Sequence, residues 1–348
     1  MSGQPKFRQN IAERRGVALV IVLWVVMVLS LLISGFAFTM HVETQVASFA
    51  RKELKAEMLA RSGIEVAKME LILHQQSPTD SAFDALNQDW STNVLYVDQE
   101  LGDGTYNVKI TDEDSKIPIN TASDLQLKRL LTLLGVDPFD ADIIVDSILD
   151  WREPGDLARL NGAKNDFYQS LSPPYRAKNA PLDRVSELLL VRGITPELYN
   201  GTATEDQPAH PSFPDLFTTM SSGKVNVNTA SAMVLQAMLN LDDQQVQSLL
   251  TRRDGPDGVP GTEDDVPFQN ETDVKNYIGG FVSTEQLASS NTSANAESPV
   301  DVKSSVFTVK SVGQVGGVKR TLVATLRREE APSTNIYVVA WSQMRGEQ

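Results

Sequence analysis

The first part of the chain carries the apolar pattern of one long helix. From Val17 to Phe38 no residue is charged, and most are Val, Leu or Ile. At 1.5 Å per residue this stretch covers about 33 Å as a helix, which is enough to cross the hydrocarbon core of a bilayer. We therefore predict a transmembrane helix over residues 17–40.

The pattern then changes without a break in the predicted helix. Residues 41–76 contain no proline, and Pro78 closes the segment. Apolar residues recur at helical spacing between charged positions. They are Val42, Val46, Phe49, Leu59, Ile64, Ala67 and Leu71. The segment 41–76 is therefore predicted to continue the same helix as an amphipathic half that packs on a soluble domain.

Alternating apolar and polar residues predict strands at both ends of the remaining chain. Residues 105–111 alternate strictly, and residues 307–312 and 318–326 flank a Gly316-Gly317 turn, which is typical of a hairpin. Residues 336–341 add another strand. We predict an α+β fold in which the helix packs on an antiparallel sheet formed by residues 77–115 and 301–348.

Residues 116–300 exceed what such a sheet needs and are mostly helical in pattern, so they are predicted to form an inserted domain. The insert contains a repeat: residues 116–123 (KIPINTAS) match residues 224–231 (KVNVNTAS), and a Leu-rich stretch follows each copy. Thr or Ser at this place is expected to cap the following helix. The Asn-Thr-Ala-Ser phrase and the cadence of residues 186–194 are similar to helix-hairpin-helix modules.

Composition and charge exclude several classes of function. The 348 residues contain 31 basic and 45 acidic side chains, no cysteine and three histidines. Disulfides, thiol nucleophiles and a histidine-rich metal site are thereby excluded, and the acid excess argues against nonspecific binding of nucleic acid. The nucleotide-binding, metalloprotease and serine-hydrolase motifs are absent, so we expect no enzymatic activity.

Basic residues precede the apolar run. Lys6, Arg8, Arg14 and Arg15 stand against one acid, Glu13, which predicts a cytoplasmic N-terminus and a periplasmic bulk of the chain. The alternative is a cleaved secretory signal, but residues 34–38 fit such a cleavage site poorly.

One turn-rich loop concentrates acidic residues. Five carboxylates lie within twelve residues that also hold glycines and prolines. They are Asp254, Asp257, Glu263, Asp264 and Asp265. Such carboxylates repel one another unless they are solvated or bridged by a cation, and flexible oxygen ligands suit Ca²⁺. The loop is therefore a candidate structural calcium site, although its spacing differs from the EF-hand and a solvated acidic loop is the alternative.

The junction of leader and span resembles a known processing site. Arg14-Arg15-Gly16-Val17 is similar to the class III leader of type IV pilins and pseudopilins. That resemblance implies that prepilin peptidase removes residues 1–16 by cutting after Gly16 and methylates the new amine of Val17. Family members usually carry glutamate at the fifth mature position, where this chain has Ile21. An intramembrane carboxylate needs a partner, so a subunit without it needs no subunit ahead of it.

The missing glutamate, the repeats and several phrases of the insert resemble the protein K family of type II secretion. These phrases include Leu149-Asp150-Trp151 and Pro173-Pro174-Tyr175. The resemblance implies a minor pseudopilin at the tip of the pseudopilus that primes its assembly for protein export. It also implies the inner membrane as location and a calcium-binding tip domain. Arg152, Lys164 and Asn165 stand where family members usually carry more acids, which argues against a cation site there.

The family also implies partners. These are the minor pseudopilins I and J, other pseudopilins of the filament, prepilin peptidase, and the secretin or a secreted substrate. The alternatives are a type IV pilus minor pilin, a membrane-tethered DNA-uptake receptor, or an unrelated single-span periplasmic module. Without the leader, 27 basic residues face 44 acidic ones, which disfavours a nucleic-acid partner.

Overall fold

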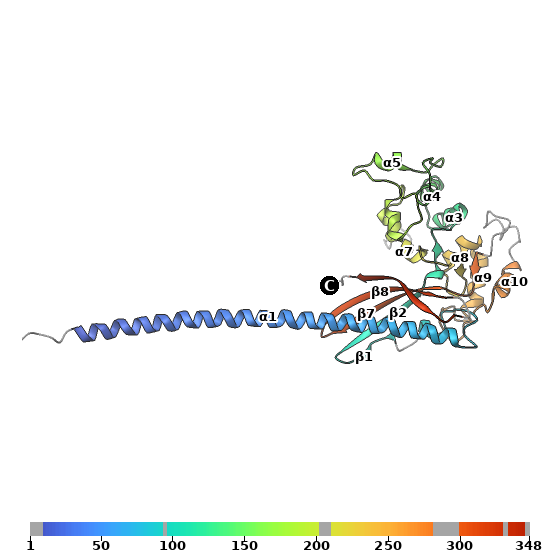
Figure 1. Ribbon diagram of the computed structural model, residues 1–348. Helices are drawn as coiled ribbons and strands as arrows, with labels where there is room; N and C mark the ends of the chain where they lie inside the picture. The colour runs from blue at the N-terminus through green and yellow to red at the C-terminus, as the bar shows by residue number, and fades with distance from the viewer. Residues whose placement is uncertain (1–9, 93–95, 202–209, 281–298, 330–332, 345–348) are drawn as a thin grey trace, which may run out of the picture.

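One helix, α1 (Asn10–Gln76), projects far beyond the rest of the molecule, which gathers around its C-terminal half (Figure 1). The computed structural model describes residues 10–92, 96–201, 210–280, 299–329 and 333–344. Residues 1–9 of the expected leader therefore lie outside the described part. The expected continuous helix over residues 17–76 is confirmed.

A five-stranded antiparallel sheet packs on the C-terminal half of α1. Its order is β1 (Gln99–Leu101), β2 (Gly104–Asp112), β7 (Val306–Val315), β8 (Val318–Arg328) and β9 (Ile336–Met344). The four expected strands are confirmed as β2, β7, β8 and β9, and β1 is an addition that the sequence pattern did not predict. Gly316 and Gly317 close the β7–β8 hairpin at φ 51° and 86°, a left-handed conformation that glycine adopts at little cost.

The contact between α1 and the sheet is unusually close. Ala56, Ala60 and Ile64 of α1 are buried against it. A Cβ atom added to Gly313 of β7 would lie 2.0 Å from the carbonyl oxygen of Ala56, so no larger residue fits there unless the helix moves. Small residues on both elements thus set the helix directly on the strand. A short helix, α2 (Asp89–Thr92), closes this core with Trp90, whose ring meets Phe307 edge-on at 5.3 Å.

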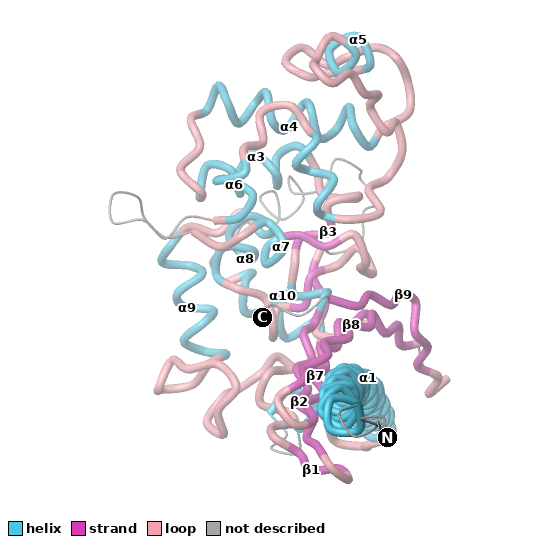
Figure 2. The backbone as a smooth tube through the Cα atoms, turned by 90° about the vertical axis from the view of Figure 1, so that its left-hand side faces the viewer, coloured by secondary structure: helices cyan, strands magenta, loops and turns pink. Residues whose placement is uncertain are grey.

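The insert lies between β2 and β7 and holds mainly short helices. Its elements are η2 (Glu113–Ser115), β3 (Ile117–Pro118), α3 (Asp124–Leu133), α4 (Pro138–Arg152), α5 (Asn165–Gln169), η3 (Val185–Leu190), α6 (Pro196–Asn200), α7 (Phe213–Leu216), β4 (Phe217–Thr218), β5 (Val225–Asn226), α8 (Ala232–Leu239), α9 (Asp243–Arg253), α10 (Glu271–Gly279) and β6 (Val300–Asp301). β3 pairs with β4 and β5 with β6, each in parallel. Viewed along α1, the insert stands to one side of the sheet and helix (Figure 2). The expected α+β fold with a mostly helical insert is confirmed.

The sequence repeat is a structural repeat. Ser123 accepts a hydrogen bond from the backbone N–H of Gln126 and caps α3, and Ser231 accepts one from that of Val234 and caps α8, as the sequence predicted. The side chain of Asn120 exchanges two hydrogen bonds with the backbone of Leu182, at 2.8 and 2.9 Å. Asn228 does the same with Phe268 at the same two distances. Each copy is therefore a short strand, a capped helix, a second helix and a return segment held by the repeat asparagine.

Candidate functional site: the exposed helix and the acidic loop

The N-terminal half of α1 is not covered by any other described part of the chain. Among the described residues, α1 is the helix long and apolar enough to cross a membrane, and the apolar window that qualifies it is wholly exposed. Ile21 is 57% exposed and Val17 is 61% exposed. The hydroxyls of Ser30 and Ser34 donate to carbonyl oxygens four residues earlier, at 2.8 Å, so they need no water. This half of the helix is suited to an apolar environment.

The predicted processing site lies inside this helix. Gly16 and Val17 both belong to α1, which begins at Asn10. Cleavage after Gly16 and methylation of Val17 remain predictions.

Beyond the apolar half, the exposed and the buried parts of α1 share one face. Val42, Val46 and Phe49 are exposed, whereas Ile64 and Ala67 are buried on the sheet. At 100° per residue all five positions fall within a narrow stripe of the helix surface. Apolar residues of this stripe therefore continue past the edge of the sheet, where no described residue of the chain covers them.

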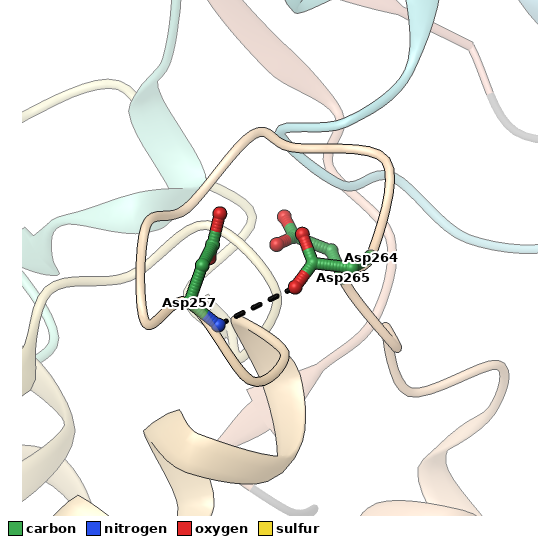
Figure 3. A group of neighbouring side chains, drawn as sticks. All are labelled: Asp257, Asp264 and Asp265. Atoms are coloured by element: carbon green, nitrogen blue, oxygen red, sulfur yellow. Dashed lines mark hydrogen bonds between the residues drawn. The ribbon is translucent and has the colours of Figure 1, made fainter.

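The acidic loop follows α9 and turns back on itself. Three of the five predicted carboxylates, those of Asp257, Asp264 and Asp265, converge so that one ligand atom from each lies within 4.8 Å of the others (Figure 3). Gly255 stands at φ 71°, and a Cβ there would lie 2.5 Å from the carbonyl oxygen of Asp264. Glycine is therefore required where the two ends of the loop approach.

Neighbouring donors already compensate part of the negative charge. Thr262 Oγ1 donates to Asp264 Oδ1 at 2.7 Å, and the Gly261 N–H donates to Asp265 Oδ2 at 2.7 Å. The Thr262 hydrogen bond is the main reason why the pKa of Asp264 is lowered. The three carboxylates fit a hard cation such as Ca²⁺, provided that carbonyl oxygens or water supply the other ligands.

The other two predicted ligands are not brought into this group. Asp254 is buried, and its two carboxylate oxygens accept from Arg253 at 2.5 and 3.1 Å. It caps the end of α9 and is occupied by its neighbour, so it is not placed to bind a cation with the others. Glu263 also lies outside the group of converging carboxylates.

Two arginines, the half-buried Arg152 and the buried Arg253, hold the repeat turns, and sequence reasoning missed both roles. Arg152 at the end of α4 donates to the carbonyl oxygens of Ile119 and Ala122, at 2.5 and 2.7 Å. Arg253 at the end of α9 donates to those of Val227 and Ala230, at 3.0 and 2.7 Å. These carbonyls occupy matching places in the two repeat motifs. The signal available in the sequence was an arginine at the end of the second helix in each copy.

A buried lysine occupies the loop after α4, the neighbourhood where the sequence argued against a cation site. The ammonium group of Lys164 donates to the carbonyl oxygens of Asp150 and Glu153 and to Oδ1 of Asn179, at 2.5, 2.7 and 3.1 Å. Three donors thus meet three acceptors, which satisfies the ammonium group. This loop is tied by an internal positive charge, whereas the acidic loop of the second copy has three carboxylates and no cation of its own among them.

Three further carboxylates are buried where the sheet meets the insert, and the sequence did not single them out. They are Asp84, Asp112 and Asp114. Asp84 Oδ1 contacts His74 Nε2 at 3.0 Å and Arg328 Nη1 at 2.9 Å. Burial alone would raise the pKa of Asp84, but the charge of Arg328 and the hydrogen bonds from His74 and Arg328 lower it to about 2.

Asp112 and Asp114 connect the sheet to the second repeat. Asp112 accepts from the hydroxyls of Thr229 and Ser304, at 2.5 and 2.6 Å, and Asp114 accepts from the hydroxyl of Ser221 at 2.6 Å. Burial and the nearby charge of Asp114 raise the pKa of Asp112 to about 7, although the two hydroxyl donors favour its charged form. Polar groups that lie 107 to 192 positions apart in sequence are thereby joined into one buried junction.

Two segments of the chain match models of a known protein family. Residues 104–203 and residues 225–302 each match a family model described as type II secretion system (T2SS), protein K, and together they cover just over half of the chain. The chain belongs to the type II secretion system protein K family. The resemblance expected from the leader, the repeats and Ile21 is confirmed.

Relatives within this family match most of the chain. The type II secretion system protein K of Pseudomonas aeruginosa is 25% identical over 328 residues, covering 90% of this chain and 89% of the relative. That of Aeromonas hydrophila is 24% identical over 335 residues, covering 90% and 92%. The putative type II secretion system protein K of Escherichia coli K12 is 26% identical over 258 residues, covering 69% and 75%.

The fold is also found in a solved structure. A chain of the crystal structure of the GspK-GspI-GspJ complex from the type 2 secretion system of enterotoxigenic Escherichia coli superimposes with a TM-score of 0.67. The match covers 87% of this chain and all of that chain, at 17% identity. At this identity the likeness shows that the two chains share a fold.

The buried junction predicts a pH dependence of stability. Folded Asp112 keeps its proton up to about pH 7, whereas the unfolded carboxyl loses it near pH 4. Between these values the folded chain binds more protons, so the free energy of unfolding falls as pH rises. We expect Asp112→Asn to flatten this fall by up to about 1.4 kcal/mol per pH unit, as measured by urea unfolding from pH 4.5 to 8. The exposed Asp140→Asn control should leave the slope as it is; equal slopes for wild type and Asp112→Asn would contradict the assignment.

Proposed function

We propose that this protein is a minor pseudopilin at the tip of the type II secretion pseudopilus, where it primes assembly of the filament for protein export. The observation that carries the proposal is the stripe of α1, which is buried on the sheet at Ile64 and Ala67 and continues uncovered through Val42, Val46 and Phe49. An apolar face of this kind indicates a site of association with other subunits. The role is one of assembly rather than catalysis.

The same helix supports a place in the inner membrane. Residues 17–38 have no charge and are exposed throughout, and the basic side chains lie ahead of them. The positive flank orients the N-terminus toward the cytoplasm, which leaves the sheet and the insert in the periplasm. The protein is thus a single-pass membrane subunit before it enters the filament.

Two features favour the tip over the shaft. Ile21 stands where a shaft subunit would carry a glutamate that meets the terminal amine of the subunit ahead, so no subunit ahead is required. The insert extends to one side of the sheet and is large beside it (Figure 2). Repeating such a volume along a helical filament would cause clashes, whereas the end of the filament leaves it free space.

The solved structure with the same fold suggests the partners. In that complex GspK is assembled with GspI and GspJ. We propose that this chain likewise binds the minor pseudopilins I and J, with the other pseudopilins following below. Prepilin peptidase would process the leader, and the secretin or a secreted substrate could meet the insert.

The DNA-uptake alternative gains no support from the geometry. Arg152 and Arg253, which end the second helix of each repeat, are directed at carbonyl oxygens inside the fold. They are not displayed toward a phosphate backbone, as nucleic-acid recognition requires. The type IV pilus alternative is not favoured by the family assignment.

The partner assignment can be tested by co-expression of the full chain with the I and J subunits of the same organism. Detergent-extracted protein should elute as one complex containing all three chains. Val46→Asp, on the uncovered stripe, should weaken this complex at least about tenfold, because a charge would be buried in an apolar contact. Ser48→Asp, on the opposite side of the same helix, is the matched control. Failure of the wild-type chain to associate with either subunit would contradict the proposal.

The processing assignment can be tested by mass spectrometry of the N-terminus. Protein purified from cells with an active prepilin peptidase should begin at Val17 with a methylated amine. Gly16→Leu should leave the chain unprocessed, while Gly35→Leu, in the apolar run, should not affect the cut. A mature chain beginning at residue 1, or cut after the apolar run, would exclude a pilin-type leader.

We also propose that Asp257, Asp264 and Asp265 bind a structural Ca²⁺. The convergence of three carboxylates supports this role, since the cation would relieve their repulsion and fix the turns of a loop that no disulfide can close. Asp254 is better explained as the partner of Arg253.

Calcium should therefore raise the melting temperature of the full chain in detergent. Saturation to about a hundred times the dissociation constant would stabilise the fold by about 3 kcal/mol, and a chelator should remove the effect. Asp264→Asn should abolish the calcium-dependent shift, whereas Glu263→Gln, in the same loop but outside the cluster, should keep it. Equal melting temperatures of the wild-type protein with and without calcium would refute the site.

A further inference from the structure

The sheet has a second face, which points away from α1 and is uncovered at its centre. The register defines it: along β7, Phe307 and Val309 point toward α1, so Thr308, Lys310 and Val312 point outward. Figure 2 shows α1 on one side of β2 and β7. The outward residues of β2, β7 and β8 that are not buried are Thr105, Asn107, Lys109, Thr111, Thr308, Lys310, Val312, Gln314, Lys319, Thr321, Val323, Thr325 and Arg327. We call this set the outer sheet face.

The outer sheet face is basic, although the chain as a whole is acidic. It carries Lys109, Lys310, Lys319 and Arg327, and the three lysines are exposed. Within the described part of the chain, none of the four takes part in an ion pair or a side-chain hydrogen bond. Four unpaired cations therefore share one face of a molecule whose net charge is −14.

The cations on the opposite side of the sheet, by contrast, are paired with acidic side chains. Arg320, which points toward α1, pairs with Glu53, and Arg328 pairs with Asp84. On the outer face the acids Asp98 and Glu100 lie only at the β1 edge, and Asp98 is bonded to the side chain of Asn107. The absence of partners at the centre is thus specific to the outer sheet face.

Two of these lysines stand directly opposite each other. Lys109 of β2 is the cross-strand partner of Lys310 of β7, in the middle of the sheet. Like charges in this position destabilise a strand pair. A folding requirement does not explain such a pair, but an anionic partner that lies over both ammonium groups would convert the repulsion into attraction.

We propose that the outer sheet face is a docking surface for an acidic polypeptide segment of another protein. Threonine, asparagine and glutamine side chains lie between the cations and offer hydrogen bonds to carboxylates and peptide groups. A lipid surface would also require apolar side chains that insert, and the centre of this face has only Val312 and Val323, both half-buried. The negative charge elsewhere on the chain repels an acidic partner, so the partner is directed to this face.

The charges and the small apolar area of the outer sheet face also determine how tightly such a segment would bind. A flat face held by exposed charges, with little apolar surface to bury, forms a salt-sensitive and short-lived complex. The face is turned away from α1, so its partner approaches from outside any assembly that α1 forms. This surface would exist whatever place the chain takes in a filament.

The test uses the full chain in nanodiscs of zwitterionic lipid, with a poly-L-glutamate peptide of about 20 residues as the probe. We expect saturable binding that weakens as salt rises. The variant Lys109→Gln/Lys310→Gln should bind at least about fivefold more weakly. The control Lys128→Gln/Lys275→Gln, which removes two ion-paired lysines of the insert, should bind like the wild type.

A second variant separates binding from folding. Lys310→Glu replaces a repulsive cross-strand pair by an attractive one, so its melting temperature should equal or exceed that of the wild type while its binding is weaker. Absence of wild-type binding, equal loss in the control variant, or binding of phosphatidylglycerol vesicles through these lysines without binding of polyglutamate would each overturn the proposal.

Discussion

The structure depends on one long helix, α1, whose N-terminal half is left exposed by the described part of the chain. The stripe of α1 that buries Ile64 and Ala67 under the sheet is the same stripe that leaves Val42 and Phe49 in solvent. Along this stripe Glu53 stands between the exposed and the buried apolar residues, and it pairs with Arg320 of β8, so the two parts lie on one side of one unbroken helix. The burial that the domain cannot provide must come from lipid or from other subunits, which is why association follows from the fold.

A helix used in this way must be held firmly at its covered end. Ala56 and Ala60 meet the backbone of β7 at Gly313, and this close packing leaves little room for α1 to slide. The buried carboxylates then join the end of this helix to the insert: His74 of α1 and Arg328 of β8 share Asp84, and Asp112 reaches Thr229 of the second repeat. Removing one partner of such a network leaves a buried charge, so the junction favours one arrangement of its parts.

Much of this architecture could be predicted because it depends on residues that are close together in sequence. The length of α1, the β7–β8 hairpin and the serine caps of α3 and α8 all follow from neighbouring residues. The junction could not be predicted, because Asp84 and Arg328 are 244 positions apart in sequence. Each of these charged residues, taken by itself, would be expected on the surface. The acidic loop shows the same limit at short range. The sequence indicated five carboxylates, but which of them converge depends on the path of the turns, and Asp254 is taken by the arginine beside it.

The two repeats show how one backbone plan can be stabilised by different charges. In both copies an arginine at the end of the second helix binds the carbonyls of the repeat turn. After it, the first copy places the ammonium group of Lys164 among oxygen atoms, and the second places three carboxylates near one another. A loop with its own cation is complete when the chain folds, whereas a loop of carboxylates gains stability from a cation taken from its surroundings. The two copies therefore share a scaffold but differ in the charges of their loops, with an ammonium group enclosed in the first and three converging carboxylates in the second.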